Sequence, residues 1–123
     1  METSASSPKH LVRPRIYIGK AINIGPGKID LLREIAAMRS ISAAARSLRL
    51  PYKRAWLLID TLNRGFGRPV VETSAGGKGG GGAVLTPLGQ QLIERYDALE
   101  TRINTSADEE LQALCRLAEK SSG

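Results

Sequence analysis

Three observations predict a mostly α-helical fold with a small β element. Apolar residues recur at helical spacing through most of the chain after Lys28. Two short β-branched segments, residues 68–73 and 83–85, flank a run of glycines. Prolines 51 and 87 stand where helices would begin, and a proline at that position loses no helical hydrogen bond. With 123 residues and 41% apolar content, the chain has room for one compact domain, which we expect over residues 15–123.

The N-terminal segment is expected to lack a core of its own. Residues 1–14 are polar, small and proline-containing, which predicts a disordered arm. Residues 15–24 alternate between apolar and polar side chains and predict a strand, imperfect around Gly19. A Gly-Pro-Gly sequence ends it, and apolar residues at helical spacing then predict a first helix over residues 28–38.

Residues 40–63 predict a short helix, a tight turn and a longer helix. Ser42 is a suitable N-cap, and the three alanines that follow it favour a helix that can approach its neighbour closely. This helix would end near Leu48, and Pro51 suits the first turn of the next one. The buried stripe of the second helix would consist of Ala55, Leu58, Ile59 and Leu62.

That pair of helices is typical of the helix-turn-helix, in which the second helix enters the major groove of DNA. The early residues of the second helix would then face the groove. They are hydrogen-bond donors or flat aromatics: Tyr52, Lys53, Arg54 and Trp56. Trp56 is also compatible with a place in the core, since it follows Ala55 on the helix.

The glycine run between the two short strands predicts a wing. Lys78, in the middle of the run, could reach phosphates from a loop without steric conflict; a plain flexible spacer is the alternative. The run also matches the letters of a dinucleotide-binding motif, but a strand candidate follows it where that motif requires a helix. A Walker loop needs Ser or Thr after the lysine, and Gly79 stands there.

Two amphipathic helices are expected after the wing, the first beginning at the cap sequence Thr86-Pro87 and the second at Asp108. Their apolar stripes could close the domain's own core or be covered by a second subunit, and we expect both uses. The predicted homodimer interface consists of Leu88, Leu92, Tyr96, Leu99, Ile103, Leu111 and Leu114.

The charge distribution favours a polyanionic partner. Residues 1–68 contain 13 Lys/Arg against 4 Asp/Glu, a net of +9, whereas residues 69–123 contain 5 against 8, a net of −3. The single histidine, His10, lies in the expected arm, so neither a catalytic triad nor a metal site can be assembled, and no enzyme activity or cofactor is expected. The single cysteine, the absence of a signal sequence and of any long apolar run predict a cytoplasmic protein with no membrane contact.

Several of these motifs resemble a known group of regulators. Residues 40–45, Leu48 and the Leu62-Asn63 pair resemble the helix-turn-helix of LysR-type regulators. Residues 52–56 and the eleven residues 76–86 are similar to the N-terminal domain of ModE-type, molybdate-responsive regulators. The resemblance implies a winged helix-turn-helix with long C-terminal dimerisation helices. It also implies a set of DNA-facing residues: Ser42, Tyr52, Lys53, Arg54, Trp56 and Lys78.

By the same resemblance, the protein is expected to regulate molybdenum-related genes and to bind double-stranded DNA as a dimer. ModE-type proteins commonly have downstream molybdate-binding domains, and this sequence ends at Gly123, so we expect no molybdate binding by this chain. The alternative function is a winged-helix protein-interaction module that modulates a full-length regulator. The basic pair Lys53-Arg54 argues against that alternative.

Overall fold

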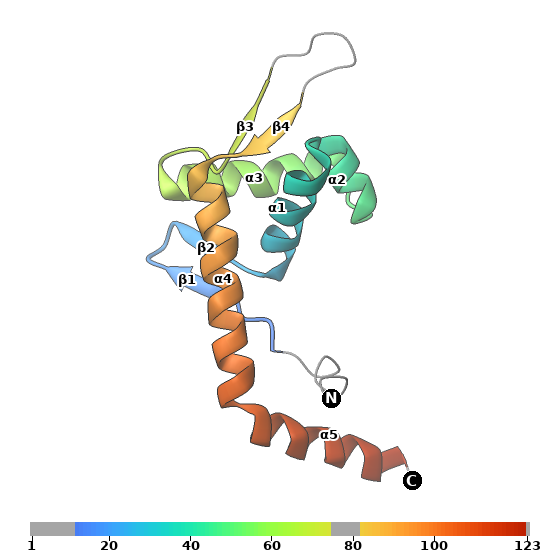
Figure 1. Cartoon of the computed structure of the whole chain (residues 1–123). Coiled ribbons are helices and arrows are strands. Elements are labelled where there is room, and N and C mark those ends of the chain that lie inside the picture. Colours follow the sequence, from blue (N-terminus) through green and yellow to red (C-terminus); the bar gives the residue numbers. More distant parts are fainter. Residues whose placement is uncertain (1–11, 75–81, 123) are drawn as a thin grey trace. The chain divides into compact units, whose positions relative to one another are not determined.

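The computed structural model describes residues 12–74 and 82–122, and the chain divides into two compact units (Figure 1). The winged unit is Pro14–Tyr96; the C-terminal unit consists of Asp97–Gly123 together with residues 1–13. Most of the expected disordered arm therefore lies outside the described residues. The sequence predicted one domain over residues 15–123, and the division into two units falls within helix α4 (Pro87–Ser106).

The winged unit begins with a β-hairpin formed by β1 (Ile16–Ile18) and β2 (Ile22–Ile24). The strands are antiparallel, with Ile16 opposite Ile24 and Ile18 opposite Ile22. Gly19 has a φ of 60°, a left-handed conformation that suits glycine in a tight turn. The single strand predicted over residues 15–24 is therefore two strands, and the break in its alternation around Gly19 marks the turn.

Helix α1 (Pro26–Met38) forms the centre of the core. Its inward face is fully buried and consists of Ile29, Leu31, Leu32 and Ile35. Lys28 is also buried, and its ammonium group donates a 2.7 Å hydrogen bond to the carbonyl oxygen of Asn23. Burial lowers the pKa of Lys28, and the positive charge of Arg15 lowers it further. This lysine therefore secures the junction between β2 and α1.

Helix α2 (Ile41–Ser47) is capped by Ser40, whose hydroxyl accepts a 3.0 Å hydrogen bond from the backbone N–H of Ala43. The prediction that Ser42 is the cap is wrong by two residues. A capping residue must stand just before the first helical residue in extended conformation, and Ser40 does so with φ −154° and ψ 126°. Ser42 instead lies exposed in the first turn, with its hydroxyl 3.2 Å from that of Ser40.

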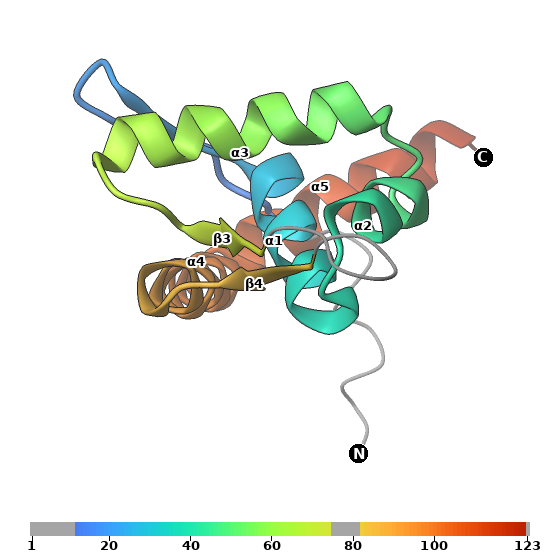
Figure 2. The same ribbon diagram turned by 90° about the horizontal axis from the view of Figure 1, so that it is seen from above.

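Helix α3 (Tyr52–Phe66) follows a turn in which Arg49 has a φ of 59°. Pro51 immediately precedes the helix as its N-cap, one position before the first turn where it was predicted. Of the predicted stripe, Ala55, Ile59 and Leu62 are buried in the core, whereas Leu58 is only partly buried against it. Figure 2 shows α3 running along one side of the winged unit.

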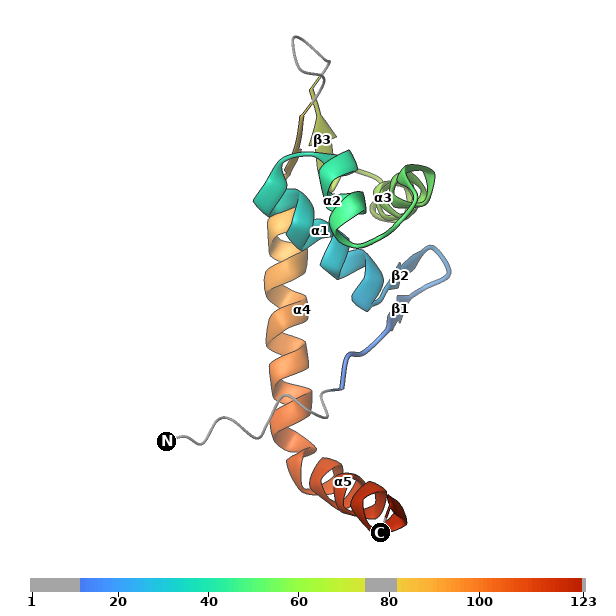
Figure 3. The same ribbon diagram turned by 90° about the vertical axis from the view of Figure 1, so that its right-hand side faces the viewer.

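The described parts of the wing are β3 (Val71–Thr73) and β4 (Ala83–Leu85), which pair antiparallel. The backbone N–H of Ala83 donates a 3.0 Å hydrogen bond to the carbonyl oxygen of Arg39 and so ties the wing to the end of α1. Seen with α3 nearly end-on, the wing strands lie on one side of that helix and the β1–β2 hairpin on the other (Figure 3). Together these elements form the predicted winged helix-turn-helix. Lys78 lies outside the described residues.

Helix α4 begins at a short hydrogen-bond network that explains the sequence of residues 85–89, Leu-Thr-Pro-Leu-Gly. The hydroxyl of Thr86 accepts a 3.1 Å hydrogen bond from the N–H of Gly89 and donates one of 2.9 Å to the carbonyl oxygen of Pro69. The predicted cap at Thr86-Pro87 is thereby confirmed. A Cβ on Gly89 would stand 2.3 Å from the carbonyl oxygen of Val70, so only glycine fits here.

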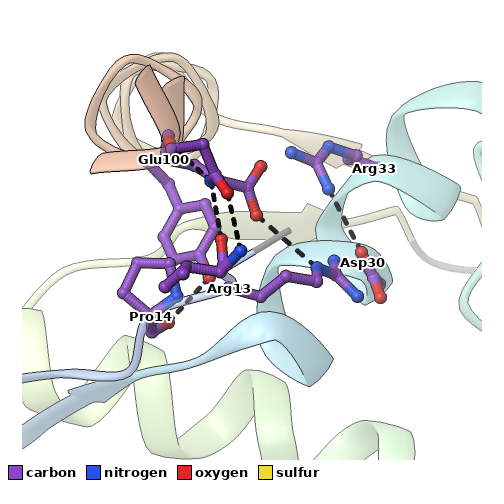
Figure 4. A network of polar contacts seen from close by, with 8 residues as sticks. Arg13, Pro14, Asp30, Arg33 and Glu100 are labelled. Atoms are coloured by element: carbon purple, nitrogen blue, oxygen red, sulfur yellow. Dashed lines mark hydrogen bonds and ion pairs between the residues drawn. The ribbon is translucent and has the colours of Figure 1, made fainter. Parts of the chain in front are cut away.

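The described C-terminal unit consists of the end of α4, helix α5 (Asp108–Ser122) and residues 12 and 13. The side-chain amide of Asn104 bonds both backbone groups of Val12, at 2.7 and 2.9 Å. Arg13 lies 3.5 Å from a carboxylate oxygen of Glu100 (Figure 4). These contacts hold Val12 and Arg13 against the end of α4. None of the described helices has the length and apolarity needed to cross a membrane.

Candidate nucleic-acid interface

The surface of α3 that points away from the core is the strongest candidate site. At about 100° per residue, Lys53, Leu57 and Arg64 lie opposite the buried stripe. All three are exposed, and the exposed fraction of Leu57 is 55%. We call the face centred on these three residues the outward face of α3.

Two aromatic side chains lie at the edge of the outward face. The rings of Tyr52 and Trp56 pack edge to face, with centroids 6.5 Å apart and an interplanar angle of 76°. The indole N–H of Trp56 donates a hydrogen bond to the hydroxyl of Tyr52. Trp56 is partly buried against the core, while Tyr52 is 52% exposed. Trp56 therefore holds Tyr52 in place beside the outward face. Its place at the edge of the core is confirmed, and its contact with DNA stays a prediction.

Positive charge is concentrated in the segment that contains α2 and α3. Residues 39–68 contain seven Lys/Arg and one acidic residue, a net charge of +6. The acidic residue, Asp60, is in an ion pair of 2.9 Å with Arg64. All seven cations are exposed: Arg39, Arg46, Arg49, Lys53, Arg54, Arg64 and Arg68. An exposed surface with this net charge attracts a polyanion.

A shallow depression runs along the first half of α3. Its lining combines cations, an aromatic ring, a leucine and a carboxylate: Pro51, Lys53, Arg54, Trp56, Leu57 and Asp60. Four of the DNA-facing candidates predicted from the sequence lie in this helix, but Leu57 is not among them. Counting in steps of 3.6 residues would have found it, because Leu57 falls off the buried stripe although it is apolar.

Arg39 is a second residue that sequence reasoning missed. It is the C-cap of α1 and has a φ of 57°, a left-handed conformation uncommon for a residue with a side chain. A small groove at the base of the wing is lined by Arg39 together with Glu72, Ser74 and Val84. No sequence pattern marked this position, because glycine or asparagine is the usual residue in such a conformation.

The predicted DNA-facing residues are partly brought together. Tyr52, Lys53, Arg54 and Trp56 share the first turns of α3, and Ser42 lies in the first turn of α2. Their contact with DNA stays a prediction. Among the described residues, no group of three His, Cys, Asp or Glu side chains is arranged to hold a metal ion.

The predicted dimer residues differ in how much surface they expose. Leu88 and Leu92 pack against the core of the winged unit. Tyr96 is 2% exposed, and its hydroxyl donates a 2.7 Å hydrogen bond to the carbonyl oxygen of Pro14 (Figure 4). In the C-terminal unit, Leu99 and Leu114 are exposed, whereas Ile103 and Leu111 are partly covered. Leu117, on α5, is 64% exposed and belongs with them.

Comparison with known proteins relates the chain to bacterial regulators. No protein-family model matches it. It is 49% identical over 74 residues to the DNA-binding transcriptional dual regulator ModE of Escherichia coli strain K12, which covers 60% of this chain and 28% of that protein. It is 39% identical over 85 residues to the transcriptional regulator ModE of Haemophilus influenzae, covering 69% and 33%.

A third relative has a different name. The molybdenum-pterin-binding protein MopB of Rhodobacter capsulatus is 46% identical over 80 residues, covering 65% of this chain and 30% of that protein. The chain thus spans about a third of the length of the curated relatives it matches.

Among solved structures, the chain resembles a crystal structure of a LysR family transcriptional regulator. The TM-score is 0.54 with 17% sequence identity, over 71% of this chain and 28% of that one. This likeness establishes the fold.

Proposed function

From its homology to ModE-type regulators and its winged helix-turn-helix fold, we propose that this protein is a sequence-specific, double-stranded-DNA-binding transcription regulator that acts as a homodimer. Its targets would be molybdenum-related genes, and it would act in the cytoplasm. The single observation behind the DNA-binding proposal is the outward face of α3, an exposed helix surface with seven exposed cations in and around it.

The first turns of α3 would supply the base contacts. The major groove of DNA admits one α-helix, and a helix that enters it presents the side chains opposite its buried stripe to the base edges. Lys53 is on that side, and Arg54 lies at its margin. Tyr52, Trp56 and Ser42 would border the groove, and Lys78 in the wing would contact phosphates.

The C-terminal unit would supply the dimer contact. Leu114 and Leu117 are more than half exposed on α5, and Leu99 is 38% exposed on α4. Residues 97–123 contain six acidic and three basic residues, a net of −3, so this unit does not favour a polyanion. A second copy of the same apolar surface, related by two-fold symmetry, would cover these leucines and place two α3 helices on successive turns of DNA.

We further propose that the described residues do not themselves bind molybdate. An oxyanion site needs several convergent donors backed by positive charge. Seven of the described exposed cations of the winged unit lie in residues 39–68, the segment proposed to bind DNA. The other three, Arg15, Lys20 and Arg95, lie apart from that segment, before β1, in the β1–β2 turn and on α4. Calorimetry with molybdate and with tungstate tests this: saturable binding below about 10 μM that also changes DNA affinity would contradict the proposal.

A salt titration on duplex DNA tests the main proposal. Binding through phosphates releases counterions, so the logarithm of affinity should fall linearly with the logarithm of salt concentration, with a slope of about −0.9 per contacted phosphate. Selection from a random duplex library should then return one enriched, two-fold-symmetric sequence. A protein that neither binds with such a slope nor enriches a sequence would instead be an interaction module that modulates a full-length regulator.

A further inference from the structure

Leu57 is the one apolar residue among the three that define the outward face of α3, and its exposure to water does not stabilise the fold. It is 55% exposed, although a leucine side chain gains free energy when it leaves water. It lies about 165° around the helix axis from the centre of the buried stripe formed by Ala55, Ile59 and Leu62. It would therefore face the floor of a groove occupied by α3, between the longer side chains of Lys53 and Arg64.

The neighbours of Leu57 define what it can contact. Lys53 and Arg54, one turn earlier, are exposed cations in the same depression. One turn later, the hydroxyl of Thr61 donates a 2.7 Å hydrogen bond to the carbonyl oxygen of Leu57, and Asp60 is paired with Arg64. The polar groups on that side are thus already hydrogen-bonded within the helix. This surface therefore fits a partner that has an apolar group for Leu57 and, beside it, anionic groups for Lys53 and Arg54.

Duplex DNA has one apolar group in its major groove, the C5-methyl group of thymine. Phosphates flank that groove on both sides and would attract Lys53 and Arg54. We infer that Leu57 is a specificity-determining residue that recognises thymine by contact with its methyl group. This inference rests on the proposed DNA-binding function and adds the base that the middle of α3 selects.

Replacement of thymine by deoxyuridine tests the inference, since it removes the methyl group and leaves every hydrogen-bonding group of the base in place. The probe is the duplex selected by the wild-type protein, with each thymine replaced in turn. Each half-site should contain one sensitive thymine. Its replacement alone should lower the affinity of the wild-type protein about fourfold, the factor expected for one buried methyl group. For Leu57→Ala, the same replacement should change affinity by less than about 1.5-fold, because most of the contact with the methyl group is already lost.

Two further variants keep the test specific. Leu57→Met keeps an apolar side chain of similar volume and should retain the discrimination against deoxyuridine. Leu114→Ala removes a leucine that is 61% exposed on α5 and should also retain it, even if overall affinity changes through dimerisation. Since Leu57 is exposed, Leu57→Ala should fold normally, which circular dichroism and thermal unfolding would verify.

The outcomes separate this inference from the proposed function. If no sequence is enriched in the selection, the proposed function fails. If a sequence is enriched but no thymine is sensitive to loss of its methyl group, or if Leu57→Ala discriminates as well as wild type, the role of Leu57 is refuted. A change in oligomeric state of Leu57→Ala with unaltered discrimination would instead place Leu57 in a protein contact.

Discussion

Helices α3 and α5 both expose leucines, and they do so in opposite electrostatic surroundings. Leu57 on α3 lies in a segment, residues 39–68, with a net charge of +6. Leu114 and Leu117 on α5 lie in a C-terminal segment, residues 97–123, with a net charge of −3. Exposed leucines on the two helices are therefore suited to two different kinds of partner. Beside cations it fits a groove walled by phosphates, and beside carboxylates it fits another protein surface.

The largest expected effect comes from reversal of charge on α3, compared with reversal of charge in the C-terminal unit. Lys53→Glu combined with Arg54→Glu should lower DNA affinity by at least about 100-fold, because each change removes a phosphate or base contact and adds repulsion. The matched control is Arg102→Glu combined with Arg116→Glu, which reverses two exposed charges in the C-terminal unit. Fluorescence anisotropy at fixed salt measures both variants. Equal losses would show that net charge, rather than the surface of α3, determines binding.

Insertion of charge into the exposed leucines of α5 should have the next largest effect. Leu114→Asp with Leu117→Asp should weaken self-association by about 2 kcal/mol or more, because a carboxylate buried at an interface without a partner loses its hydration. Leu57→Asp, on the outward face of α3, should leave the dimer intact. Sedimentation velocity at several concentrations gives the comparison. An unchanged association constant for the α5 variant would remove α5 from the interface.

The first turn of α4 is expected to matter for stability, and this helix begins in the winged unit and ends in the C-terminal unit. Gly89→Ala should lower the free energy of unfolding by about 1–3 kcal/mol, because the new Cβ would collide with the carbonyl oxygen of Val70. Gly27→Ala is the control: it lies in α1 with nothing within 4 Å of the added atom, and alanine is the better helix former. Urea unfolding of both variants measures the difference, and equal stabilities would contradict this account of Gly89.

The smallest predicted effect concerns Arg39. Arg39→Gly should raise the free energy of unfolding by up to about 1 kcal/mol, since glycine adopts the left-handed conformation without strain. At the same time it should weaken DNA binding about threefold and reduce the salt slope by about one per subunit, as expected for loss of one phosphate contact. Arg39→Lys keeps the charge and should preserve the slope. Unchanged DNA affinity in Arg39→Gly would exclude Arg39 from the interface.

Local sequence patterns predicted most of the secondary structure. The apolar stripe of α3, the cap at Thr86-Pro87 and the start of α5 at Asp108 all occur where the sequence placed them. Each of these features depends on residues within about one helical turn. The misplaced cap at Ser42 shows where such reasoning stops, because Ser40 and Ser42 are equally suitable by residue type. Backbone conformation alone decides between them.

The sequence was thus sufficient to predict the helix-turn-helix, the two wing strands, the basic first half and the acidic second half, because residue type and spacing specify these locally. It predicted a single strand where the β1–β2 hairpin has two. Only the tertiary structure decided which apolar residues are covered. It buries Tyr96 against the core and bonds it to Pro14, 82 residues away, while it leaves Leu57 exposed among cations. It also placed Arg39 at the base of the wing through a bond to Ala83. Burial depends on contacts between segments distant in the chain, and periodicity within one segment does not contain that information.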